Sequence, residues 1–284
     1  MFCALVWSGR GSVFSEGKRV SYWEAIVLGL LQGVTEFLPV SSSGHLAVGH
    51  LLFGERTASS TAFDVLVHGA TLLVIFGVFG RLLVSLAREN RRLLLILLVA
   101  SIPTALIGLI WRHEMESLAS HPLALAWCFC ITGSFLWKVG REEGSAADGA
   151  GEGMPAAAAW HVRWGDALVI GLAQALAIAP GCSRSGLTIS AGRLCGVSAE
   201  QAVAFSFLLG APAIVGALAI ESSQIGQLAA VSPGPLAAGF AAALVSGIAA
   251  MSLLKHVAKR GLLPRFAPYC FLMAGLCVLL AATR

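Results

Sequence analysis

Residues 32–45 read QGVTEFLPVSSSGH, which puts an amide, a carboxylate, three serines and a histidine into one short stretch. Gln32 and Glu36 are four residues apart, so on a helix they lie on one face. An amide oxygen and a carboxylate on one face can coordinate a hard divalent cation, Mg²⁺ or Ca²⁺, while water and phosphate oxygens complete the shell. Because Pro39 disfavours helix at the residue before it, the helix is predicted to end there.

The turn that follows offers hydroxyls and backbone N–H groups from Ser41, Ser42 and Ser43. His45 could act as a general base or acid, because histidine titrates near neutral pH. A histidine that only caps or packs would fit the same position. The residue types therefore allow group transfer in this turn and leave the role of His45 open.

A second polar interruption, PGCSRSG, spans residues 180–186. It combines glycines that allow close backbone approach with two serines and an arginine: Gly181, Ser183, Arg184, Ser185 and Gly186. A guanidinium, hydroxyls and the start of the next helix together are typical of a phosphate-binding site. Alternatively, Arg184 only pairs with Glu36 and holds the two stretches together.

These polar stretches lie in a very apolar chain. The 284 residues are 57% hydrophobic and only 12% charged, with a mean hydropathy of +0.82. Soluble domains carry roughly 25% charged residues, so the composition predicts an integral membrane protein surrounded by lipid. The net charge of +4 is small and scattered, which argues against a nucleic-acid partner.

Six apolar segments are long enough to cross a bilayer as helices. They are residues 63–80, 93–111, 122–139, 200–220, 233–254 and 266–282. Two further apolar stretches, 24–53 and 165–196, are each broken near the centre by Pro, Gly and Ser. The predicted fold is therefore an all-α polytopic membrane protein with six transmembrane helices.

The Lys and Arg content of the loops predicts which side of the membrane each loop faces. The loops at 81–92 and 255–265 each carry four Lys or Arg residues, so both are predicted to be cytoplasmic. The loops at 112–121 and 221–232 contain one Arg and no Lys, which places them outside. Consistency then requires both interrupted stretches to be re-entrant helical hairpins, 24–53 entering from outside and 165–196 from inside.

The two interrupted stretches resemble each other at a constant offset of 142 residues. The matched pairs are Gly29 with Gly171, Gln32 with Gln174, Ser41 with Ser183, Ser43 with Ser185, Gly44 with Gly186, and Gly54 with Gly196. We therefore divide the single membrane domain into a leader (1–20), a first inverted repeat (21–139), a cytoplasmic linker (140–163) and a second inverted repeat (164–284). Non-helical backbone inside a membrane must be buried in protein, so the two hairpin tips are predicted to meet and form a polar pocket.

The motifs QGVTEFLPVSSSGHL and PGCSRSGLTISAG closely resemble those of the bacterial undecaprenyl-diphosphate phosphatases, also called the bacitracin-resistance protein family. The resemblance extends over most of residues 21–282. It implies hydrolysis of undecaprenyl diphosphate to undecaprenyl phosphate and inorganic phosphate, which recycles the lipid carrier for peptidoglycan synthesis. It also implies a location in the bacterial inner membrane, among membrane lipids.

The resemblance assigns roles to individual residues. The acidic motif falls on Gln32 and Glu36, the serine and histidine on Ser42 and His45, and the phosphate-binding arginine on Arg184. Ser42 is then the expected nucleophile with His45 as its base, although attack by water or by His45 itself stays open. Two departures from the family pattern are Gln32, which leaves a single carboxylate for a cation, and a cysteine at position 182, where threonine is common.

Two further expectations concern access and partners. Because Glu36 and His45 belong to the hairpin predicted to enter from outside, the active site should face the periplasm or exterior. A transporter or flippase for a polyprenyl phosphate lipid has a similar architecture and is the alternative function. The small-residue stretch at 239–250 permits close helix packing, either within the chain or in a homodimer.

Overall fold

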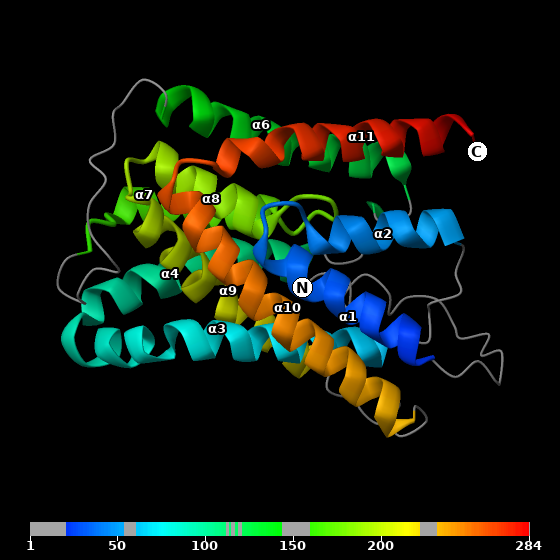
Figure 1. Ribbon diagram of the computed structural model, residues 1–284. Helices are drawn as coiled ribbons and strands as arrows, with labels where there is room; N and C mark the ends of the chain where they lie inside the picture. The colour runs from blue at the N-terminus through cyan, green and yellow to red at the C-terminus, as the bar shows by residue number, and fades with distance from the viewer. Residues whose placement is uncertain are drawn as a thin grey trace.

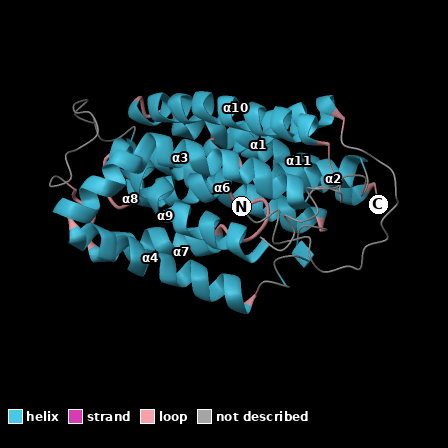
Figure 2. Ribbon diagram, turned by 90° about the horizontal axis from the view of Figure 1, so that it is seen from below, coloured by secondary structure: helices cyan, strands magenta, loops and turns pink. Residues whose placement is uncertain are grey.

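The computed structural model describes residues 21–53, 61–111, 114, 117–118, 121–143, 160–221 and 232–283. Every regular element in these ranges is a helix (Figure 2). The elements are α1 (Tyr22–Phe37), α2 (Ser42–Phe53), α3 (Thr61–Glu89), α4 (Arg91–Ile110), α6 (Pro122–Glu143), α7 (Trp164–Leu176), α8 (Arg184–Leu194), α9 (Ala199–Glu221), α10 (Pro233–Lys259), the 3₁₀ helix η3 (Leu263–Phe266) and α11 (Ala267–Ala282). The leader at 1–20 and most of the predicted linker lie outside the described residues.

Six of these helices are long and apolar enough to cross a membrane: α3, α4, α6, α9, α10 and α11. They correspond to the six predicted spans, so the all-α fold with six transmembrane helices is confirmed, while re-entry of the two interrupted stretches into the membrane stays a prediction. Several helices are longer than the apolar segments that predicted them. Arg81 and Arg88 belong to α3 and not to a loop, and only Asn90 separates α3 from α4. The side chain of Asn90 accepts a hydrogen bond from the backbone N–H of Leu93 and caps α4.

The two interrupted stretches form two short helical pairs, α1–α2 and α7–α8. Each pair packs along one long helix, α1 against α10 and α7 against α4. Glycine makes both contacts close, because a Cβ atom on Gly29 would overlap the carbonyl of Gly239 and one on Gly171 would overlap the carbonyl of Ala100. The division into inverted repeats stays a prediction.

The two pairs open toward opposite ends of the bundle (Figure 1). Tyr22 lies against Gly234, so α1 begins beside the start of α10. Gly171 contacts Ala100, and one turn later Gln174 contacts Thr104. The two helices therefore run in the same direction, and α7 begins beside the start of α4. The start of α4, like the end of α10, lies at the bundle end that is rich in Lys and Arg.

The small-residue stretch at 239–250 is used within the chain. Gly239 contacts α1 and Phe63, while Gly247 contacts Phe37 and Val74. Of the other long helices, α3 and α9 also pack against α10, and α6 and α11 lie side by side along one edge of the bundle (Figure 1). Among the described residues, the buried apolar side chains form one large cluster and two small ones, and the large cluster includes Leu38 and Cys182 of the two tips.

Candidate functional site

The tip of the first hairpin is a tight turn between α1 and α2. Leu38 has an extended backbone before Pro39, and the helix ends at Phe37 as the proline predicts. Ser41 then adopts a left-handed backbone conformation with φ of 69°. Its hydroxyl accepts a hydrogen bond from the N–H of Gly44 at 3.2 Å, which caps the start of α2.

The tip of the second hairpin repeats this arrangement with other residues. Gly181 supplies the left-handed conformation, with φ of 94°. The Ser183 hydroxyl accepts a hydrogen bond from the N–H of Gly186 at 3.1 Å and caps α8. The backbone N–H of Ser183 donates to Thr132 of α6 at 2.9 Å, which anchors this tip to the bundle.

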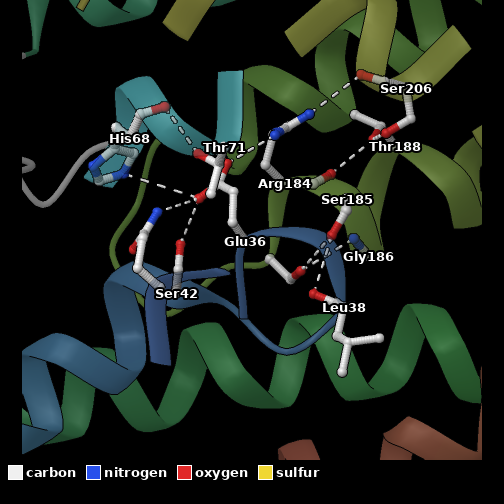
Figure 3. A network of polar contacts seen from close by, with 12 residues as sticks. Glu36, Leu38, Ser42, His68, Thr71, Arg184, Ser185, Gly186, Thr188 and Ser206 are labelled. Carbon is white, nitrogen blue, oxygen red and sulfur yellow. Dashed lines mark hydrogen bonds and ion pairs between the residues drawn. The ribbon is translucent and has the colours of Figure 1, made fainter. Parts of the chain in front are cut away.

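The two tips meet inside the bundle, and polar contacts join them directly (Figure 3). Arg184 Nη2 donates to Glu36 Oε1 at 2.9 Å. The Ser185 hydroxyl donates to the carbonyl of Leu38 at 3.2 Å. Both side chains of the ion pair are nearly enclosed, with 12% exposure for Arg184 and 4% for Glu36. The contact therefore brings a carboxylate of the first tip and a guanidinium of the second into one site.

Glu36 also gathers polar groups of its own hairpin. Its Oε2 accepts a hydrogen bond from the Ser42 hydroxyl at 2.9 Å and another from the Gln32 amide at 3.1 Å. His68 Nε2 of α3 lies 3.9 Å from the same oxygen. A serine hydroxyl that donates to a buried carboxylate has an acceptor for its proton already in place, which is the arrangement an activated nucleophile needs.

Arg184 is held from the other side by α9. Its Nη1 donates to the carbonyl of Ser206 at 3.4 Å, and its guanidinium lies 5.1 Å from the ring centroid of Phe207. A Cβ atom on Gly210 would overlap the guanidinium, so glycine at that position makes room for it. The Arg184 Nε atom is buried and has no hydrogen-bond partner. Arg184 is thus fixed in place and keeps unused donor capacity.

A pocket lies between the two tips. It is lined by residues of both hairpins and of α4: Thr35, Glu36, Ser41, Ser42, Ser43, Thr104, Gln174, Ala177, Cys182, Ser183, Arg184 and Ser185. Most of these side chains carry hydroxyl, carboxylate, amide or guanidinium groups. A buried pocket of this composition can hold an anionic, oxygen-rich ligand beside a serine hydroxyl.

A family model described as "Bacitracin resistance protein BacA" matches residues 25–276. The chain belongs to this family. Two similar relatives are named "Undecaprenyl-diphosphatase". The protein from Syntrophotalea carbinolica is 39% identical over 274 residues, covering 90% of this chain and 98% of the relative. The protein from Carboxydothermus hydrogenoformans is 36% identical over 265 residues, covering 92% and 97%. "Undecaprenyl-diphosphatase 4" of Bacillus thuringiensis subsp. konkukian is 34% identical, covering 88% and 93%.

Most of the site residues expected from the sequence lie together. Glu36, Ser42 and Arg184 line the pocket, as do the four flanking serines: Ser41, Ser43, Ser183 and Ser185. Gln32 does not line the pocket, and its amide donates a hydrogen bond to Glu36. The N–H of Gly186 is already bonded to the Ser183 hydroxyl, and Gly181 serves the turn through its backbone conformation.

His45 is directed elsewhere. Its Nδ1 lies 2.7 Å from the carbonyl oxygen of Ser41, and its Nε2 lies 2.6 Å from the hydroxyl of Tyr269 on α11. The two rings stack with centroids 5.6 Å apart. Both ring nitrogens thus contact groups other than Ser42, and the role of His45 as base stays a prediction.

Several pocket and supporting residues were not expected from the sequence. Thr104 and Gln174 line the pocket, and Thr132 anchors the second tip. Only Gln174 had a signal in the sequence, since it matches Gln32 in the 142-residue offset. The cysteine that departs from the family pattern, Cys182, lies in the tip and directs its thiol at the carbonyl of Cys128 at 3.7 Å.

Proposed function

We infer that this chain hydrolyses undecaprenyl diphosphate to undecaprenyl phosphate and inorganic phosphate. The single observation that carries the inference is the contact of Ser42 and Arg184 with the same buried carboxylate, Glu36. The names of the relatives favour this activity over lipid transport. Purified protein in detergent should release inorganic phosphate from undecaprenyl diphosphate, whereas movement of the lipid across vesicles without phosphate release would support the transporter alternative.

We propose Ser42 as the nucleophile. Its oxygen attacks the terminal phosphorus, the bond from that phosphorus to the bridging oxygen breaks, and undecaprenyl phosphate leaves with the bonding electrons. The Ser42 proton passes along the existing 2.9 Å hydrogen bond to Glu36 Oε2. Water then hydrolyses the phosphoserine and releases inorganic phosphate. Glu36 replaces His45 here as the proton acceptor because it is the group that contacts the hydroxyl.

The proposed phosphate-binding group is Arg184, together with the serine hydroxyls of both tips. A guanidinium can bind phosphate oxygens through two parallel N–H donors, and charge that develops on those oxygens is stabilised by donors already in position. Arg184 is held by Glu36 and Ser206 before any ligand arrives. The geometry therefore favours transition-state stabilisation without rearrangement of the arginine.

We also propose that Gln32 and Glu36 hold a divalent cation, Mg²⁺ or Ca²⁺. The donor set fits a hard ion, because the Gln32 Oε1 atom is buried without a hydrogen-bond partner and lies on the residue next to Glu36 on the helix face. A single carboxylate gives a weak site, so phosphate oxygens of the substrate would have to complete it. When bound, the cation would neutralise part of the diphosphate charge.

The cation is tested by its removal and by a change of charge at position 32. Excess chelator should abolish phosphate release, and added Mg²⁺ or Ca²⁺ should restore it. Gln32→Glu adds a second carboxylate and should lower the cation concentration for half-maximal activity about tenfold, since ligand charge sets affinity in such sites. Gln174→Leu, the repeat-related control, should leave the cation requirement unchanged. Full activity in excess chelator would remove the cation from the mechanism.

We propose that the protein lies in the bacterial inner membrane with the first hairpin entering from the periplasmic or exterior side. Support comes from the concentration of Lys and Arg at the bundle end where α10 finishes and α4 starts. A 55-carbon lipid could then stay in the bilayer while its diphosphate reaches the pocket between the helices. The small residues at 239–250 pack within the chain, and the homodimer stays a prediction without further support.

Cysteine labelling can decide the orientation. A membrane-impermeant maleimide applied to intact cells should label Ser232→Cys, at the start of α10, and should label Arg260→Cys, just after its end, only once the membrane is permeabilised. The unmodified protein, whose described cysteines are buried or half-buried, gives the background. The reverse labelling pattern would show the opposite membrane orientation, with the first hairpin on the cytoplasmic side.

A further inference from the structure

Two buried glutamines occupy matching places in the two hairpins, and each leaves its carbonyl oxygen without a partner. Gln32 is 0% exposed and Gln174 is 2% exposed. The amide NH₂ of Gln32 donates to Glu36, and that of Gln174 donates to the Thr104 hydroxyl at 3.2 Å. Both Oε1 atoms are buried and unpaired. A buried acceptor without a partner is unfavourable, so each of the two amides is a candidate to interact with a bound ligand.

The second glutamine serves a different purpose from the first. The residue 142 positions after Glu36 is Ile178, so Gln174 has no carboxylate on its own helix face. Its partner is instead Thr104 on α4. The close contact of Gly171 with Ala100 brings α7 and α4 together one turn earlier, which places Gln174 beside Thr104. The result is an amide–hydroxyl pair on the wall of the pocket, contributed by helices outside the first hairpin.

This pair can present a donor to the pocket. A threonine hydroxyl can donate or accept a hydrogen bond. The Gln174 amide can therefore turn about its terminal bond, accept from Thr104 and direct its NH₂ into the pocket. The lining around it contains serine hydroxyls and Arg184, which are donors suited to an anion. A phosphate oxygen in the pocket would accept hydrogen bonds both from the amide NH₂ and from the serine hydroxyls.

We propose that Gln174 and Thr104 form a second phosphate subsite, which binds the phosphate that carries the lipid. The proposal rests on the inferred reaction, in which the terminal phosphate lies between Ser42 and Arg184. The lipid-bearing phosphate is joined to it through one bridging oxygen and must lie in the same pocket. Gln174 and Thr104 line that pocket and have no part in the attack.

Ligand binding tests the subsite without any turnover. The probes are farnesyl phosphate, which carries one lipid-linked phosphate, and farnesol, which lacks it. Both are titrated into purified wild-type protein and the Gln174→Leu and Thr104→Val variants, with affinity measured from ligand-dependent thermal shifts. Gln174→Leu should weaken farnesyl phosphate binding about tenfold, the loss of roughly one good hydrogen bond to a charged group. Farnesol affinity should stay the same, and Thr104→Val should act in the same direction to a smaller extent.

The control and the contrary outcomes separate the alternatives. Ser101→Ala, on α4 one turn before Thr104 and outside the pocket lining, should leave farnesyl phosphate affinity unchanged, since its hydroxyl donates to the carbonyl of Leu97 at 2.9 Å. Unchanged farnesyl phosphate affinity in Gln174→Leu would overturn the subsite, as would an equal loss for farnesol, which would mean general damage to the pocket. A change in divalent cation requirement with intact farnesyl phosphate binding would make Gln174 a cation ligand instead. Because binding is measured directly, absence of phosphate release would count against the inferred reaction and not against this subsite.

Discussion

Replacing Ser42 by alanine is expected to lower the rate of phosphate release at least about a thousandfold, because the reaction loses its nucleophile. The fold should survive. Ser42 contributes one hydrogen bond, to Glu36, at the first position of α2. Loss of a hydrogen bond to a charged group costs roughly 1.5–3 kcal/mol, and circular dichroism and melting in detergent should therefore report a helical, folded protein. The measurement is phosphate release under saturating substrate.

The neighbouring serine is the matched control for this result. Ser43 also lines the pocket, but its hydroxyl lies 3.3 Å from that of Ser41. Ser43→Ala should lose less than about tenfold, as expected for one binding contact. Quenching the wild-type enzyme during turnover of substrate labelled in the terminal phosphate should leave label on Ser42. Label on His45, or a Ser42→Ala protein that keeps its activity, would show that histidine or water attacks phosphorus.

Breaking the ion pair between the tips is expected to damage stability and activity together. Glu36→Gln leaves the Arg184 guanidinium buried beside a neutral amide, and Arg184→Met leaves the carboxylate without its strongest partner. Removing one partner of a buried pair costs about 3–5 kcal/mol. Each single variant should therefore melt well below the wild type, and phosphate release should fall at least about a thousandfold.

The double variant separates the two effects. With both charges gone, Glu36→Gln combined with Arg184→Met should recover most of the melting temperature, because neither side keeps an unmatched charge. Its activity should stay at the level of the single variants. Arg163→Met is the control, since Arg163 pairs with Asp166 at 3.2 Å while its side chain is 76% exposed, and loss of such a solvent-screened pair should leave the melting temperature nearly unchanged. Equal melting temperatures for single and double variants would mean that the pair does not hold the tips together.

Composition and hydropathy were enough to predict the six long helices. Their ends were predicted less well, because hydropathy locates the lipid-facing part of a helix and not the point where its hydrogen bonding stops. Arg81 and Arg88 ended the apolar segment, yet α3 continues through both to Glu89. The turn at Pro39 was predictable, since proline restricts the residue before it whatever the tertiary context.

The site was predictable where one short motif contains both a residue and the groups that this residue contacts. Ser42 and Glu36 are close in sequence and close in space. Contacts between distant helices had no such signal. Nothing in the sequence pairs Gln174 with Thr104, 70 residues away, or directs His45 toward Tyr269 rather than Ser42. Side-chain direction depends on which helices flank the hairpin, and that is set by packing contacts such as Gly171 on Ala100.

The joined tips restrict how the interior can communicate with the two aqueous compartments. Switching the cavity from one compartment to the other would require the hairpins to separate, with rupture of the Glu36–Arg184 and Ser185–Leu38 contacts. Leaving one half of such an ionic contact buried without its partner costs about 3–5 kcal/mol, a barrier that a carrier would have to cross in every cycle. A hydrolase that admits its lipid from a fixed side would not need this separation, and intact tip contacts would also oppose leakage of small ions through the centre of the protein.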